Sequence, residues 1–88
     1  MEKNENQRLR EAILEVINTQ IQDNDPPETK RTLERLMSMG ESRKNAIRYI
    51  GSVLSVEIFE ALQNQSPYDE GRYVENLKAL PKLRFEDE

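Results

Sequence analysis

The stretch IGSVLSVEIFEAL, residues 50–62, decides the fold. Its apolar residues recur at three- and four-residue steps, the spacing of one face of an α-helix. On such a helix Glu57 falls in the same narrow sector as Ile50 and Leu54, in the middle of the apolar face. The stretch therefore predicts a central helix that packs against several neighbours and holds one carboxylate within the packed seam.

Glu57 is predicted to be at least half buried. Because an unpaired buried charge is costly, it is expected to meet a cation or a hydroxyl, or to bind a proton. The candidate partners are Arg8, Arg35, Arg72, Tyr49 and Tyr73. The favoured interpretation is a structural ion pair or hydrogen bond that fixes helix register. The alternatives are the carboxylate of a ligand pocket and exposure of Glu57 through a wider groove.

Gly51 flanks the same apolar face. A glycine in the middle of a helix costs about 1 kcal/mol relative to alanine. The expected compensation is the close approach of another helix, within the monomer or across a dimer, for which only a bare α-carbon leaves room. Gly51 is therefore predicted to be a helix-contact position.

Capping signals define the helices around this one. Asp25 is the predicted N-cap of a second helix, with Glu28 at its third position and Gly40 as its stop. Ser42 is predicted to cap the central helix and Asp69 a fourth one. The predicted helices cover about residues 4–22, 26–39, 43–64 and 70–80.

These helices predict one small all-α, bundle-like domain over residues 1–88, with residues 1–3 and 86–88 loose. Tyr68 and Tyr73 are expected to pack across Asp69, and Leu83 and Phe85 to dock. On the second helix Arg35 is expected to face water, as are Lys30, Arg31 and Glu34. The predicted core positions are Leu9, Ile13, Val16, Ile17, Ile21, Leu33, Leu36, Met37, Ala46, Ile47, Ile50, Val53, Leu54, Ile58, Ala61, Leu62, Tyr73, Val74, Leu77 and Leu80.

The composition excludes several kinds of site. The chain has no cysteine and no histidine, so it supplies no disulfide, thiolate, imidazole base or soft metal ligand. Asp23, Asp25 and Glu28 lie close together but lack the spacing of a calcium-binding loop. No catalytic, cofactor-binding or metal-ligating residue is assigned, and no cofactor is expected.

The charge balance bears on partners. A net charge of −4 opposes nucleic-acid binding. No apolar run approaches the roughly 20 residues of a membrane span, and the polar start MEKNENQRLR is unlike a signal peptide. A cytoplasmic protein that binds neither membranes nor nucleic acids is expected. The cations Arg31, Arg35, Arg43, Lys44 and Arg48 are interpreted as a solvated face, with binding of an acidic partner as the alternative.

The segments DPPETKRTLERLMSMG (25–40), SVLSVEIFEAL (52–62) and SPYDEGRYVENLKALP (66–81) together resemble a family of small bacterial domains of unknown function, of the DUF1841 type or found beside SEC-C modules. The resemblance covers about residues 25–81. It implies a small helical bacterial domain and transfers no catalytic residue. The chain lacks the cysteines and histidine of a SEC-C zinc site, so zinc binding does not carry over.

The expected function is that of a non-enzymatic helical interaction module, because no nucleophile–base pair, phosphate loop or metal set is present. It would work by self-association, for instance as a homodimer, or by binding a protein partner. The apolar side chains expected on its face are Leu14, Met39, Val56 and Phe59. The alternative is a small-ligand-binding or regulatory domain with a pocket around Glu57, Tyr49 and Tyr73.

Overall fold

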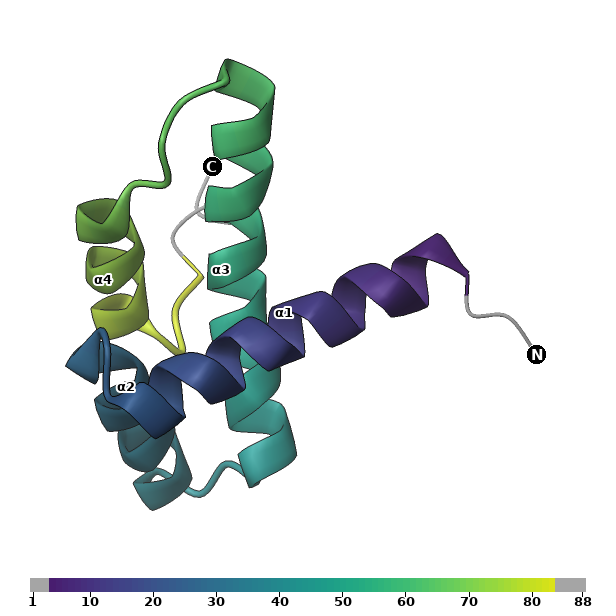
Figure 1. Cartoon of the computed structure of the whole chain (residues 1–88). Helices are drawn as coiled ribbons and strands as arrows, with labels where there is room; N and C mark the ends of the chain where they lie inside the picture. The colour runs from purple at the N-terminus through teal and green to yellow at the C-terminus, as the bar shows by residue number, and fades with distance from the viewer. Residues whose placement is uncertain (1–3, 84–88) are drawn as a thin grey trace.

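The computed structural model describes residues 4–83, and all regular structure within that range is α-helical. The helices are α1 (Glu5–Asp23), α2 (Pro27–Ser38), α3 (Arg43–Asn64) and α4 (Glu70–Ala79). Both α2 and α3 pack against all three other helices. Figure 1 shows α2 and α4 beside α3, with α1 crossing it.

The predicted all-α, bundle-like fold is confirmed, and every predicted helix end lies within one residue of the observed one. The ends predicted to be loose, residues 1–3 and 86–88, lie outside the described residues, as does Phe85.

Local capping chemistry sets most of the helix ends. The Asn4 side chain accepts a hydrogen bond from the Gln7 backbone N–H, and the Gln7 side chain accepts one from Asn4, which forms a capping box at α1. The Ser42 hydroxyl caps α3 and the Asp69 carboxylate caps α4, each accepting from the backbone N–H three residues on. Gly40, with φ at 104°, follows the end of α2.

The predicted N-cap of α2 is wrong. Pro26, not Asp25, occupies the N-cap position, and no side chain caps this helix. Because Pro26 is followed by Pro27, it is held in the extended region, with ψ at 148°, and the helix begins one residue later than predicted. Glu28 consequently lies at the second helical position instead of the third. Pro27 lacks an N–H, so the start of this helix has one unpaired donor fewer than usual.

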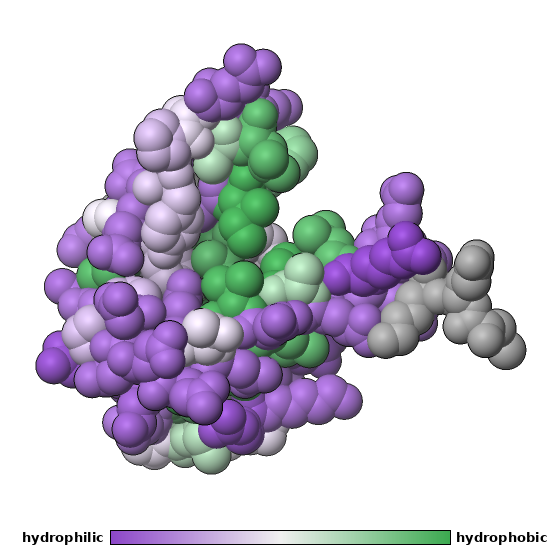
Figure 2. All heavy atoms as spheres, viewed as in Figure 1, coloured by the Kyte–Doolittle hydropathy of each residue, from purple (hydrophilic) through white to green (hydrophobic). Residues whose placement is uncertain are grey.

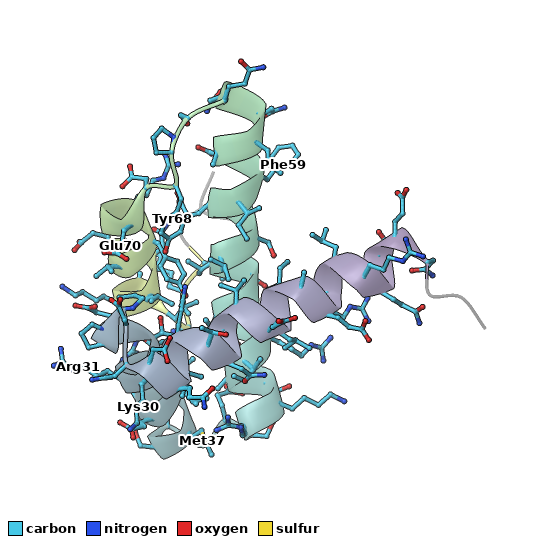
Figure 3. All side chains as sticks on the ribbon, in the orientation of Figure 1. Lys30, Arg31, Met37, Phe59, Tyr68 and Glu70 are labelled. Carbon is cyan, nitrogen blue, oxygen red and sulfur yellow. The ribbon has the colours of Figure 1, made fainter. Side chains whose placement is uncertain are left out.

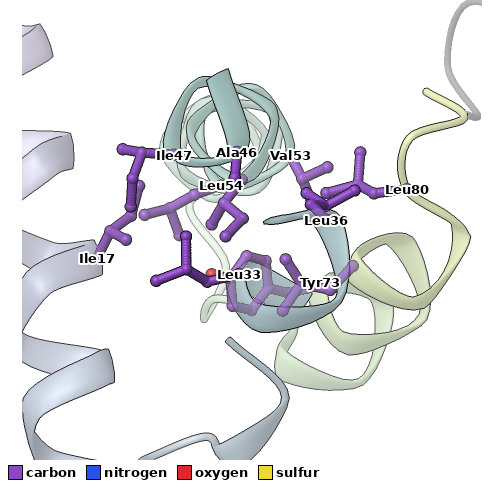
Figure 4. Close-up of a cluster of buried hydrophobic side chains, with 11 residues drawn as sticks. Ile17, Leu33, Leu36, Ala46, Ile47, Val53, Leu54, Tyr73 and Leu80 are labelled. Atoms are coloured by element: carbon purple, nitrogen blue, oxygen red, sulfur yellow. The ribbon is translucent and has the colours of Figure 1, made fainter. Parts of the chain in front are cut away.

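The core lies where α1, α2 and α4 converge on α3 (Figure 4). Burial of each large aliphatic side chain contributes about 1.5–3 kcal/mol, so this cluster is the main stabilising term of the fold. The buried apolar residues are Ile17, Leu33, Leu36, Ala46, Ile47, Ile50, Val53, Leu54, Tyr73, Leu77 and Leu80.

The predicted core is too large. On α1 only Ile17 is buried, whereas Leu9 is 56% and Val16 39% exposed. Leu62, near the end of α3, is 74% exposed, and Met37 on α2 is exposed as well. The reason is geometric, because the first half of α1 extends past the other helices (Figure 1) and only its second half meets them.

Gly51 lies where α1 crosses α3. A Cβ atom at this position would lie 3.6 Å from Ile13 Cγ2 and 3.7 Å from Ile17 Cδ1. These are ordinary van der Waals distances, so the crossing has room for a methyl group. Gly51 is thus at a helix contact, but the expectation that only a bare α-carbon fits there is wrong.

We predict that Gly51→Ala raises the free energy of unfolding by about 0.5–1 kcal/mol, because it removes the helix penalty of glycine without a clash. Urea unfolding followed by circular dichroism measures the change. Gly51→Leu is the control and should destabilise the protein, since its longer side chain must displace Ile13 and Ile17. A loss of stability in Gly51→Ala would mean that the two helices lie closer together than the structure has them.

Candidate functional site

The Glu57 carboxylate is buried in an ion pair between α3 and α4. It is 1% exposed, and both of its oxygens accept hydrogen bonds from Arg72, at 2.7 Å from Nε and 2.9 Å from Nη2. Of the candidate partners named above, Arg72 is the one that meets Glu57. The paired fork geometry satisfies both carboxylate oxygens, so this group acts as a cross-link between the two helices.

Arg72 is shared between two carboxylates. Its Nη2 also lies 2.8 Å from Glu60 Oε2, one turn along α3 from Glu57. The hydrogen bond to Glu57 is the main cause that raises the pKa of Arg72 above its ordinary value. The side chain is therefore a permanent cation. A shallow depression lies over this cluster, and the paired side chains Arg72 and Glu60 line it together with Glu57.

Tyr73 belongs to a different polar cluster. Its fully buried hydroxyl donates to Gln20 Oε1 at 2.8 Å, and the Thr29 hydroxyl donates to the same oxygen at 2.7 Å. Burial raises the pKa of Tyr73 to about 12, against an opposing effect of the hydrogen bond with Thr29. The cluster joins α1, α2 and α4. The ring centroids of Tyr68 and Tyr73 lie 5.7 Å apart, so the two rings pack together across Asp69 as expected.

Tyr49 lies apart from both clusters. It is partly buried on α3, beside Leu83 in a depression that Glu41 also lines. The structure therefore does not bring Glu57, Tyr49 and Tyr73 together into one pocket. The ligand-pocket alternative also required that Glu57 have no protein partner. This condition is not met, because Arg72 pairs with Glu57.

Sequence reasoning missed three polar groups. Gln20 lies on the apolar stripe of α1, and this position was a usable signal, of the same kind that singled out Glu57. Thr29 gave no such signal. Arg35, expected to face water, instead donates from Nη1 to Leu80 O at 2.6 Å and from Nη2 to Leu77 O at 3.0 Å, so it satisfies carbonyls at the end of α4.

The apolar side chains that α1 and α3 leave exposed form a continuous surface. Figure 2 shows apolar atoms running along α3 and onto α1 in the angle between the two helices, and Figure 3 shows Phe59 pointing from α3 toward the side on which α1 extends. To this surface, the apolar angle, we assign Leu9 and Val16 of α1 with Ile58, Phe59 and Leu62 of α3.

The face expected from the sequence does not match this surface. Phe59 belongs to the apolar angle, while Leu14 lies on the other flank of α1. Met39, which is exposed, follows the last residue of α2, and Val56 lines the depression over the ion pair. Leu9, Val16 and Leu62 were missed because their helical spacing is that of core residues.

No protein-family model matches the chain, and no curated protein or solved structure matches it. The resemblance to DUF1841-type domains stays a prediction. Among residues 4–83, no three acidic side chains are grouped to hold a metal ion, and no helix there is long and apolar enough to cross a membrane. The function must be inferred from the surfaces themselves.

We predict an asymmetry between the two halves of the ion pair. Glu57→Gln should lower the free energy of unfolding by about 1–2 kcal/mol, since Arg72 stays partly exposed and keeps Glu60. Arg72→Met should cost more, because it leaves a carboxylate buried without a cation. Urea unfolding at neutral pH measures both. Glu60→Gln is the control and should change little. Equal losses in the first two variants would contradict a buried Glu57.

We predict that stability falls with pH between about pH 10 and 12 through Tyr73. In the unfolded chain a tyrosine loses its proton near pH 10, whereas folded Tyr73 keeps its proton to about pH 12. Below pH 10 both states are protonated. Above pH 10 the free energy of unfolding decreases, by about 3 kcal/mol in total once Tyr73 is ionised in both states.

Urea unfolding at a series of alkaline pH values tests this dependence against Tyr73→Phe. The variant loses one buried hydrogen bond at neutral pH, about 1 kcal/mol, and should show a flatter decline above pH 10. Burial, together with neighbouring Tyr73, also raises the pKa of Tyr68, so some decline remains in the variant. Parallel pH profiles for the two proteins would contradict the assignment to Tyr73.

Proposed function

We propose that this chain is a non-enzymatic helical interaction module that associates with a second copy of itself through the apolar angle. The observation that carries the proposal is the exposure of large apolar side chains on both arms of that angle, with Leu9 at 56%, Phe59 at 61% and Leu62 at 74%. Contiguous apolar surface of this kind on a small domain is typical of an association site.

The first half of α1 supplies a second argument. Of residues 4–16, all but Ile13 are exposed, so this half of the helix has little tertiary support. Isolated helices shorter than about 12–15 residues are only marginally stable in water. A partner that covers Leu9 and Val16 would stabilise this half as well as bury its apolar face.

A two-fold symmetric dimer would cover the exposed apolar residues of both α1 and α3. The first half of α1 from one copy would lie against the second half of α3 from the other, and the reverse pair would form by symmetry. Each copy carries a net charge of −4. Because like charges oppose association and salt screens them, self-association should strengthen as ionic strength rises.

We predict that Leu62→Glu abolishes self-association, as measured by sedimentation velocity over a concentration series. Its effect on the fold should be below about 0.5 kcal/mol, because the Leu62 side chain is mostly exposed in the monomer. Met39→Glu is the matched control. It places the same charge on an exposed apolar position outside the apolar angle and should leave the oligomeric state unchanged. A wild-type protein that stays monomeric at its highest soluble concentration would overturn self-association.

A further inference from the structure

A second surface of different chemistry lies on the other flank of α1. Here α1 and α3 line a groove of about 800 Å³. Arg10, Leu14 and Asn18 line it at four-residue steps on α1, as do Lys44, Arg48 and Ser52 on α3. The groove therefore lies in the angle where α1 crosses α3, and each helix contributes one row of side chains to it.

The rim of the groove is positively charged. Arg10, Arg43, Lys44 and Arg48 all line it, and no aspartate or glutamate does, although acids outnumber bases 17 to 13 in the chain. None of the ion pairs within residues 4–83 involves any of these four cations. We name this surface the basic groove. Its charge is therefore available to a partner.

Two of these cations lie at the start of a helix, where positive charge destabilises the helix. Arg43 and Lys44 are in the first turn of α3, which contains no acidic residue. The helix dipole favours negative charge at that end and disfavours positive charge. A carboxylate bound between these side chains would relieve the conflict. The acid next to this turn, Glu41, accepts from Asn45, and the ion pairs found within residues 4–83 involve neither Arg43 nor Lys44.

The floor of the groove is apolar. Ile13 and Ile47 line it, and the absence of a side chain at Gly51 deepens it beside them. An apolar floor with a cationic rim complements an amphipathic segment that has aliphatic side chains on one face and carboxylates at its edges. Nucleic acid fits less well, because the floor offers no exposed aromatic ring for stacking and the chain as a whole is acidic.

We propose that the basic groove binds an acidic amphipathic helix of a partner protein. The proposal rests on the interaction role argued above, but on a surface separate from the apolar angle. The partner would place aliphatic side chains over Ile13 and Ile47 and carboxylates against Arg43, Lys44 and Arg48. Salt should weaken this contact, the opposite of its effect on self-association.

The test uses fluorescence anisotropy and a fluorescein-labelled synthetic helix of about 15 residues, with leucines at three- and four-residue spacing and glutamates on both flanks. The full chain should bind it. The double variant Arg43→Gln, Lys44→Gln should bind about fivefold more weakly. The same variant should melt at an equal or higher temperature than the wild type, because it removes cations from the start of α3. Weaker binding together with undiminished stability separates partner recognition from a structural role.

Matched controls separate the groove from general charge attraction. The double variant Lys30→Gln, Arg31→Gln removes the same charge from exposed positions of α2 that do not line the groove (Figure 3) and should bind the peptide as the wild type does. A peptide with glutamine in place of each glutamate should bind more weakly. Equal loss in the α2 variant, equal affinity for the glutamine peptide, or no binding of the acidic peptide would each overturn the proposal.

Two further outcomes would assign the groove to another occupant. Tighter binding of duplex DNA, lost in the Arg43→Gln, Lys44→Gln variant, would overturn the peptide proposal in favour of nucleic acid. Loss of self-association in that variant would assign the groove to a second copy. Leu62→Glu should keep the peptide affinity, so failure of the groove and failure of the apolar angle are distinguishable.

Discussion

The main constraint on this structure is that α3 is longer than each of the two helices that pack beside it. α3 has 22 residues, while α2 and α4 have 12 and 10. At about 1.5 Å per residue, neither can follow α3 along its whole length. α1 crosses α3 at Gly51 instead of lying beside it (Figure 1), so it covers the middle of the exposed face and leaves both ends open.

Polar contacts between helices add directional constraints to the apolar core. Glu57 fixes α4 against α3 through Arg72, Gln20 ties α1 to α2 and α4, and Arg35 holds the end of α4. Each of these groups is buried or half-buried and has a defined partner. Since a helix slipped by one residue would leave such groups unsatisfied, they favour one packing arrangement over others of similar apolar burial.

The α1–α3 crossing separates two surfaces of contrasting chemistry. On one flank of α1, apolar side chains of α1 and α3 dominate the surface (Figure 2). On the other flank an apolar floor carries the cations Arg10, Lys44 and Arg48. A surface without charge favours contact with a like surface, while a charged rim selects its partner by sign. The proposals of self-association and of a distinct acidic partner thus rest on two separate surfaces of the same two helices.

The sequence by itself determined the helices, their ends to within one residue and the burial of Glu57, because these follow from local spacing and capping chemistry. It also marked Gly51 as a contact point between helices. Only the tertiary structure decided which cation meets Glu57, that Tyr49 and Tyr73 lie apart, and that Leu9, Val16 and Leu62 stay exposed. Helical periodicity reports which side of a helix is apolar, whereas the crossing of α1 over α3 decides how much of that side another helix covers.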